Sequence, residues 1–433
     1  MKLYYILFSF ILGTIRCNDE DMELLLVQAL WRHGERAALL DLFPIYEKDW
    51  IFGGGGFGEL TATGMGQMFE LGQTLRKKYA NFISNRYDSK EIYVRSTDIN
   101  RTMISAMSVM YGLYLQDDTK RAGIDYPDIP GWSKGFNFVP IHVDSTTDNY
   151  LTNSRPPCPR YNQLTEMMKN LQEYKDWIKS SSVFRNSFYS IYNLSATSEN
   201  SPAAFDSLKC QSTSFIDTLY AKCPWYNQQF FEQSQSNYGP FKGFIQGYFK
   251  QPAILNGIDI GKEIKILQGG PLLADVYDRI KNKIDCSTSS DCQGFMKNLK
   301  FYAYSVHDHN IYSQLVNLGL ADLTDSLDYW PSYSATILHE TYRSVSKNTT
   351  FFKVWYKKSY RSEVMDATTK IKGCEDTPYC PISVLTDLVE LYSPKPNLKT
   401  LCYQELKSFS SQVLHPASTL IFIVIYLLSD LFH

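Results

Sequence analysis

Residues 23–36 read ELLLVQALWRHGER. The first eight of these residues form a short, nearly continuous apolar run, which is typical of a strand buried on both faces in a sheet with helices on either side. Arg32, His33 and Arg36 follow that run directly. Open α/β sheets bind their ligands at the carboxyl ends of their strands. This stretch therefore predicts an α/β fold and also the place of a functional site.

Two further segments repeat this pattern of an apolar run that ends in polar chemistry. Residues 91–94 (EIYV) run into Arg95, and residues 300–306 (KFYAYSV) run into His307 and Asp308. If the three runs are strands of one sheet, their ends converge on one site. We expect the basic and titratable side chains at these ends to lie close together.

The intervals between these runs are helical in pattern. From Met65 to Tyr79 apolar residues recur at steps of mostly three and four, with Thr61 or Thr63 as a candidate N-cap. Residues 161–249 show helical spacing without strong strand signals. We therefore expect an α/β protein with a central, mostly parallel sheet flanked by helices and a smaller helical cap formed by this insertion.

Composition limits the class of protein and the kind of partner. The 433 residues are 44% hydrophobic, 20% charged and 15% aromatic, and the formal net charge is -2. These values are those of a folded globular chain long enough for a sizeable core. Because no overall basic field is present, we expect no nucleic-acid partner, and any anion site must be local.

The two ends of the chain carry targeting signals. Residues 1–17 have the charge, apolar core and small-residue order of a secretory signal peptide, so the main domain is expected over residues 18–412. Residues 413–433 are largely apolar but shorter than a typical spanning helix. We interpret this tail as a membrane anchor or a lipid-anchor signal, with a frayed hydrophobic terminus as the alternative. The expected location is the secretory pathway, as a lysosomal, extracellular-surface or membrane-anchored protein.

Cysteines and sequons agree with a secreted glycoprotein. Eight cysteines remain beyond Cys17, an even number that implies disulfides in an oxidising compartment. Short spacing favours the pairs Cys286 with Cys292 and Cys374 with Cys380, although eight cysteines allow 105 pairings. Glycosylation sequons begin at Asn100, Asn193 and Asn348.

The surroundings of His33 suggest nucleophilic chemistry on a phosphate. A lone histidine is usually structural or solvated. Two permanently charged guanidinium groups beside the imidazole lower its pKa, favour its neutral form and bind phosphate through paired N–H donors. The alternative is a surface ion-pair cluster that includes Glu35.

Residues 27–36 (VQALWRHGER) resemble the RHGxR signature of the histidine acid phosphatase family, the branch of the histidine phosphatase superfamily that includes prostatic and lysosomal acid phosphatases and phytases. Residues 93–102 (YVRSTDINRT) resemble its second phosphate-binding segment, and residues 304–308 (YSVHD) resemble its distal HD motif. Weaker similarity covers most of the chain between the signal and Cys402. The chain departs from the family pattern at Ala37-Ala38 and at His309-Asn310. These positions shape the rim of the pocket, so they bear on substrate preference more than on the reaction.

The resemblance implies a reaction and a role for each matching residue. His33 would be the phosphorylated nucleophile and Asp308 the acid that protonates the leaving oxygen. The phosphate of a monoester substrate would be held by Arg32, Arg36, Arg95 and a protonated His307. The family implies no metal and no other cofactor. Since Asp308 must first be protonated, an acidic optimum is expected.

Other functions and partners stay open on the sequence. The run His307-Asp308-His309 could hold a metal in a dinuclear hydrolase, which would make the chain a metal-dependent phosphohydrolase. A catalytically silent secreted binding protein on the same scaffold is a third hypothesis. A zinc-protease interpretation of His339-Glu340 fails because position 343 is arginine. A homodimer is also possible.

Overall fold

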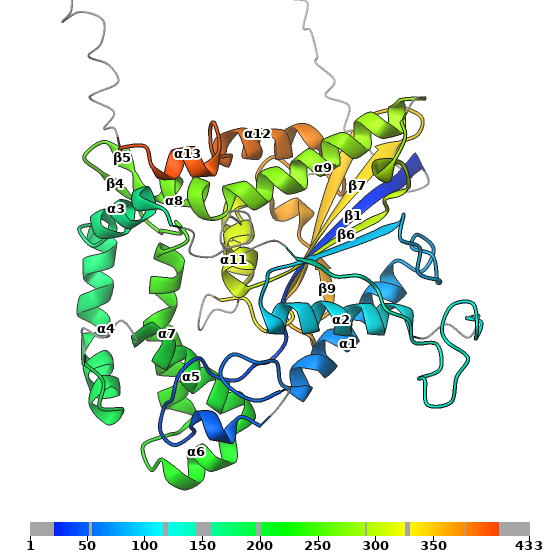
Figure 1. The fold of residues 1–433 in the computed structure, drawn as a ribbon. Coiled ribbons are helices and arrows are strands. Elements are labelled where there is room, and N and C mark those ends of the chain that lie inside the picture. Colours follow the sequence, from blue (N-terminus) through cyan, green and yellow to red (C-terminus); the bar gives the residue numbers. More distant parts are fainter. Residues whose placement is uncertain are drawn as a thin grey trace, which may run out of the picture.

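We analysed a computed structural model of the chain, which describes residues 21–406 except 52–53, 116–119, 144–156, 196–200, 291, 325–329 and 376. Figure 1 shows a twisted central sheet with helices on both faces and a group of helices to one side of it. The predicted α/β class with flanking helices and a helical cap is confirmed. The predicted signal peptide and hydrophobic tail lie outside the described residues. Within the described ranges, no helix is long and apolar enough to cross a membrane.

The central sheet is mixed. The described strands are hydrogen-bonded in the order β10-β8-β7-β1-β6-β2-β3, with β9 beside β8. One half is parallel and consists of β1 (Met22–Arg32), β6 (Phe301–Val306), β2 (Ile92–Ser96) and β3 (His142–Val143). The other half is antiparallel and consists of β7 (Thr336–Ser344), β8 (Thr350–Lys357), β9 (Val364–Asp366) and β10 (Cys380–Pro381). The expectation of a mostly parallel sheet therefore holds only for the half that contains the three predicted strands.

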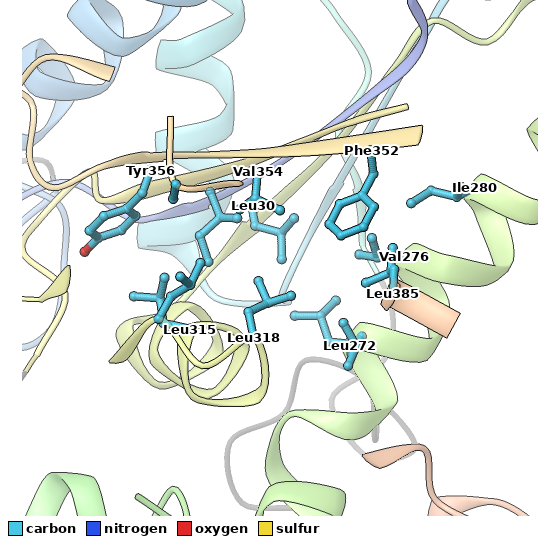
Figure 2. Packing of buried hydrophobic residues seen from close by; sticks show 14 of the residues in the cluster. Leu30, Leu272, Val276, Ile280, Leu315, Leu318, Phe352, Val354, Tyr356 and Leu385 are labelled. Carbon is cyan, nitrogen blue, oxygen red and sulfur yellow. The ribbon is translucent and has the colours of Figure 1, made fainter. Parts of the chain in front are cut away.

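Alternate residues of β1 face two different hydrophobic clusters. Leu26 and Leu30 pack toward α9 (Gly270–Thr288), α11 (Asp308–Asn317) and α12 (Ile382–Tyr392), as Figure 2 shows for the labelled Leu30. Val27, Ala29 and Trp31 pack toward α1 (Ala62–Lys78) and α2 (Asn100–Tyr114) on the other face. A strand buried on both sides must be apolar throughout, which explains the continuous run in the sequence.

Helices α1 and α2 approach each other closely. A Cβ on Gly72 would lie 2.1 Å from the backbone oxygen of Val109, and one on Gly112 would lie 2.1 Å from that of Phe69. Only glycine, which has no Cβ, allows the two helix backbones to approach this closely. Helix α1 begins after Thr61, whose side chain accepts a hydrogen bond from the N–H of Gly64, as expected of an N-cap.

The described part of the cap contains five helices, the first of which begins at Pro159, two residues before the predicted insertion. They are α3 (Pro159–Met168), α4 (Gln172–Ile191), α5 (Ser201–Ser214), α6 (Ile216–Lys222) and α7 (Gln228–Phe244). An aromatic cluster joins α4, α5 and α7 through Phe188, Phe205 and Phe230. The other described elements are β4 (Ile254–Leu255), β5 (Ile258–Asp259), α8 (Ile260–Gln268), α10 (Phe295–Asn298), α13 (Leu398–Cys402) and the 3-10 turns η2 (Glu47–Asp49), η3 (Ala321–Leu323) and η4 (Thr368–Lys370).

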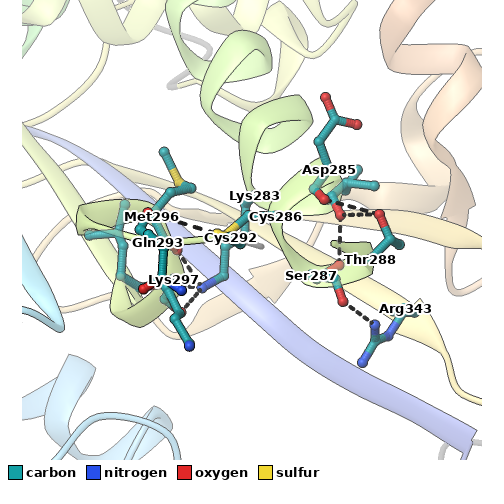
Figure 3. Close-up of a disulfide and its surroundings, with 12 residues drawn as sticks. Lys283, Asp285, Cys286, Ser287, Thr288, Cys292, Gln293, Met296, Lys297 and Arg343 are labelled. Atoms are coloured by element: carbon teal, nitrogen blue, oxygen red, sulfur yellow. Dashed lines mark hydrogen bonds between the residues drawn. A yellow bond between two sulfur atoms is a disulfide. The ribbon is translucent and has the colours of Figure 1, made fainter. Parts of the chain in front are cut away.

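Three disulfides hold the described chain. The two short-range pairs, Cys286–Cys292 and Cys374–Cys380, are as predicted, and Cys158–Cys402 joins the cap to the last helix. Near Cys286–Cys292 (Figure 3), the Lys283 ammonium donates to the carbonyl oxygens of residues 296, 297 and 299. The even cysteine set implied disulfides, and three are present; the other two cysteines of that set, Cys210 and Cys223, are free and buried.

Candidate active site

His33 lies just beyond the end of β1 and is almost completely buried. Its Nδ1 atom is 2.8 Å from the carbonyl oxygen of Gly34. A carbonyl only accepts, so Nδ1 carries the proton and the Nε2 lone pair is left for chemistry. Burial, and then the charges of Arg101 and Arg32, hold the pKa of His33 well below its usual value. These surroundings therefore favour the neutral imidazole.

Gly34 has to be glycine because the chain turns against α1 at this point. A Cβ at Gly34 would lie 2.3 Å from the backbone oxygen of Gly64 in the first turn of α1. The N–H of Gly34 also donates to the hydroxyl of Ser105 in α2, at 3.1 Å. The backbone next to His33 is thus held by both helices on this face of the sheet.

Three arginines surround this histidine. Arg32 donates to the carbonyl of Pro331 at 2.8 Å, pairs with Asp308 at 2.7 Å and lies over the ring of Tyr333. Arg36 and Arg101 contribute to the electrostatic environment of the same imidazole. The Nε–H groups of all three arginines are buried and have no hydrogen-bond partner among the described residues. Buried cationic donors without partners are suited to an anion such as phosphate.

The arginine that the structure brings to the site from the second motif is Arg101, six residues after the predicted Arg95. Arg101 lies in the first turn of α2, and its Nη2 atom is 3.5 Å from Nδ1 of His307. Burial, and then the charge of Arg36, lower its pKa to about 10. Arg95 lies within β2, in register with Tyr304, and its guanidinium is 3.9 Å from Asp275. Arg95 is therefore not part of the cluster around His33.

His307 and Asp308 follow the end of β6, as predicted. The rings of His33 and His307 are 5.5 Å apart. His307 Nε2 is 3.0 Å from the hydroxyl of Thr97, and its Nδ1 faces a guanidinium that can only donate. Burial and the nearby Arg101 hold the pKa of His307 well below its usual value. These surroundings favour a neutral His307, whereas the resemblance implied a protonated imidazole.

Asp308 is ionised in the unliganded protein. Burial alone would raise the pKa of this carboxyl, but the Arg32 guanidinium at 2.7 Å and the neighbouring His309 hold it well below its usual range. Its Oδ1 atom also accepts a hydrogen bond from the backbone N–H of His309, at 2.9 Å. Asp308 is the first residue of α11, where the helix dipole favours the carboxylate as well.

The cap contributes a carboxylate that sequence reasoning missed. Asp206 of α5 accepts two hydrogen bonds from Nη2 of Arg36, each 3.0 Å long. No motif marked Asp206, because its contact depends on how the cap packs on the sheet. Arg101 did carry a signal, because the segment that resembles the family's second motif contains both arginines. The sequence could not show which of the two, Arg95 or Arg101, lies close to His33.

A cleft lies elsewhere, near the amino ends of the same strands. It has a volume of about 820 Å³ and is lined by residues that include Glu23, Glu91 and Lys300. Two of its cations are already compensated, since Lys300 pairs with Glu91 and Arg343 with Glu23. In the part of the chain that the structure describes, no group of three or more His, Cys, Asp and Glu side chains is placed to hold a metal ion.

Known proteins resemble this chain in sequence and in fold. The model of the histidine phosphatase superfamily (branch 2) matches residues 23–357. A Caenorhabditis elegans protein named "Putative acid phosphatase 10" is 40% identical over 408 residues, which is 92% of this chain and 99% of that protein. Human lysosomal acid phosphatase is 30% identical over 374 residues, 85% of this chain and 78% of that protein. The fold resembles a Hafnia alvei phytase solved with tartrate, with a TM-score of 0.59, 14% identity and coverage of 89% and 99% of the two chains.

The chain therefore belongs to branch 2 of the histidine phosphatase superfamily, as the three motifs indicated. Within that branch it is an acid phosphatase, the activity named for the relatives that match most of its length. The structural likeness to the phytase confirms the fold alone.

Proposed function

We propose that this acid phosphatase hydrolyses phosphate monoesters in two steps, through a phosphohistidine on Nε2 of His33. The observation that supports this most directly is a neutral, buried imidazole whose Nδ1–H is bound to a carbonyl and whose surroundings hold three arginines. An unprotonated Nε2 is a nucleophile, and splitting hydrolysis into two displacements is covalent catalysis.

The arginines stabilise the charge of the phosphoryl group that is transferred. Arg32, Arg36 and Arg101 present buried N–H donors that have no partner among the residues that the structure describes. During transfer, negative charge spreads over the equatorial oxygens of phosphorus, and fixed cationic donors stabilise it without reorganising. Arg95 is not assigned this role, because its guanidinium lies next to Asp275.

Asp308 is proposed as the general acid. Because its contact with Arg32 favours the carboxylate, binding of the substrate has to bring about the protonation of Asp308. In the unliganded protein the Arg32 guanidinium keeps this carboxylate ionised. A bound phosphate competes with Asp308 for the Arg32 guanidinium and adds negative charge nearby. Both effects raise the pKa of Asp308. Protonated Asp308 then gives its proton to the leaving oxygen, and the resulting carboxylate activates water for the second step.

The protonation state of His307 changes for the same reason. A phosphate between Arg101 and His307 raises the pKa of this imidazole above its value in the unliganded protein. His307 then binds the phosphate as a cation. The protonated His307 expected from the resemblance is therefore the phosphate-bound form.

A substitution at His33 tests this function. His33→Ala should abolish hydrolysis of an aryl phosphate at pH about 5, and the unaltered protein should yield an acid-labile phosphoenzyme that the variant does not. Retained turnover in the variant would overturn the phosphohistidine mechanism. Loss of activity in a chelator would favour a metal-dependent phosphohydrolase. Failure to trap a phosphoenzyme with any phosphate ester would favour a silent binding protein.

The secretory route is part of the same proposal. Three disulfides in the described residues favour an oxidising compartment, and relatives include lysosomal acid phosphatases. Membrane attachment through residues 413–433 stays a prediction. Expression of the full chain followed by treatment with a phospholipase that cuts lipid anchors checks it: release of activity from the cell surface indicates a lipid anchor.

A further inference from the structure

Helix α5 of the cap presents one polar stripe to the segment that follows His33. Asp206, Cys210 and Ser214 are four residues apart and so lie on one face of the helix. Asp206 and Cys210 contact Arg36, at 3.0 and 3.4 Å, and Ser214 donates to Glu35 at 2.9 Å. The cap is therefore in direct polar contact with the first motif.

Two neighbouring side chains extend this contact along the backbone beyond the motif. The hydroxyl of Ser207 donates to the carbonyl of Leu40 at 3.2 Å, and the amide of Gln211 donates to the carbonyl of Leu42 at 2.5 Å. Both donors are buried. A buried donor without a partner is costly, so these contacts fix the register of α5 on this segment.

The contacts at Arg36 determine how its guanidinium is oriented. Nη2 is held by both oxygens of Asp206, while Nη1 donates to the carbonyl of Ala37 at 3.0 Å and lies near Cys210. The Sγ atom of Cys210 also lies 3.3 Å from the hydroxyl of Tyr333, so the thiol is enclosed between these groups. The Nε–H of Arg36 has no partner in the described structure. Asp206 thus holds the far edge of the guanidinium and leaves Nε for an anion.

We propose that Asp206 is a positioning residue of the phosphatase, through which cap helix α5 sets the orientation of Arg36 in the phosphate site. This assignment rests on the proposed function of Arg36. Asp206 carries a negative charge close to the bound phosphate, so it weakens binding of the ground state while it orients a donor for the transition state. Misplacing a catalytic group by about 1 Å can cost on the order of a hundredfold in rate.

The test compares Asp206→Ala and Asp206→Asn with Asp217→Asn, a matched change at an exposed aspartate in the first turn of α6. We expect kcat for an aryl phosphate at pH about 5 to fall roughly ten- to a hundredfold in Asp206→Ala, with KM changed less than about threefold. Asp206→Asn should lose less, because its amide oxygen still accepts from Nη2. Asp217→Asn should keep kcat and KM within about twofold of the unaltered protein.

Two further measurements make the result decisive. Melting temperatures show how much of each variant is folded, and if Asp206→Ala does not fold, the nearly isosteric Asp206→Asn carries the test. A kcat within twofold of the Asp217→Asn control in the folded Asp206 variants overturns the role of Asp206 alone. Calorimetry with inorganic phosphate on the unaltered protein distinguishes this result from a failure of the proposed function. If the unaltered protein neither binds phosphate nor hydrolyses the aryl phosphate, both the proposed function and this inference are overturned.

Discussion

Nη2 of Arg101 lies 3.5 Å from Nδ1 of His307, and this contact joins the start of α2 to the end of β6. Arg95, in the same motif, lies beside Asp275 instead. Arg95 shares the face of the sheet on which Tyr304 and α9 lie, because registered neighbours in parallel strands point the same way. Arg101 follows the turn after β2, where the chain crosses the carboxyl end of the sheet. This difference in backbone path decides which of the two arginines lies beside His307.

The first prediction separates these two arginines. Arg101→Ala should lower kcat/KM for an aryl phosphate by at least about a hundredfold, because it removes a charge-stabilising donor from the phosphate site. Arg95→Ala should stay within about fivefold of the unaltered protein, since the ion pair that it removes is partly exposed and lies beside Asp275, outside the cluster around His33. Steady-state kinetics on both variants checks this. A larger loss in Arg95→Ala than in Arg101→Ala would contradict the arrangement.

The second prediction concerns Asp308 and the leaving group. Asp308→Asn removes the proton donor but keeps the shape of the side chain, so kcat for an alkyl phosphate should fall by about a hundred- to ten-thousand-fold. An aryl phosphate with an acidic phenol needs less protonation and should lose much less. Measuring kcat over a series of leaving groups tests this. Equal losses for all members of the series would rule out Asp308 as the general acid.

The third prediction concerns the pH dependence of stability and rests on His339 in β7. This side chain is fully buried, neither ring nitrogen has a partner in the described residues, and burial lowers its pKa to about 4. In the unfolded chain the pKa of this histidine is about 6.5. Between pH 6.5 and pH 4 the unfolded chain therefore binds a proton that the folded chain does not, so the free energy of unfolding falls as the pH is lowered through this range. From pH 7 to pH 5 the loss from this group is about 2 kcal/mol.

Replacing His339 removes that contribution. In His339→Leu the decrease in the free energy of unfolding between pH 7 and pH 5 should be smaller than in the unaltered protein by about 2 kcal/mol. His33 and His307 titrate in the same direction but are present in both proteins, so the difference isolates His339. Urea denaturation at both pH values measures it. Parallel pH profiles would show that His339 has a near-normal pKa.

The fourth prediction concerns two glycines near the first motif. Gly34→Ala should destabilise the protein by at least about 2 kcal/mol and impair catalysis, because its Cβ would meet the backbone of Gly64 at 2.3 Å. Gly66→Ala is the control: Gly66 is an exposed residue of α1 with no atom within 4 Å of the added Cβ. That change should stabilise the helix by up to about 1 kcal/mol. Thermal unfolding and activity assays on both variants distinguish the two effects, and similar stabilities would contradict the close approach.

Much of the scaffold was predictable because its signals are local. The apolar runs that became β1, β2 and β6 are continuous in sequence, and the N-cap Thr61 and the pairs Cys286–Cys292 and Cys374–Cys380 involve residues near each other in the chain. The antiparallel half of the sheet was missed. The unpaired state of Cys210 and Cys223 could not be deduced, because pairing depends on distances between elements that sequence spacing does not determine.

For the site itself, sequence alone determined that His33, Arg32, Arg36, His307 and Asp308 belong together, because strand ends in one sheet must converge. Tertiary structure alone decided that Arg101 rather than Arg95 joins them, and that Asp206 reaches Arg36 from the cap. The path of a turn and the docking of a helix depend on packing between distant segments. The same packing buries His33 and His307 beside Arg101 and so lowers the pKa of both imidazoles.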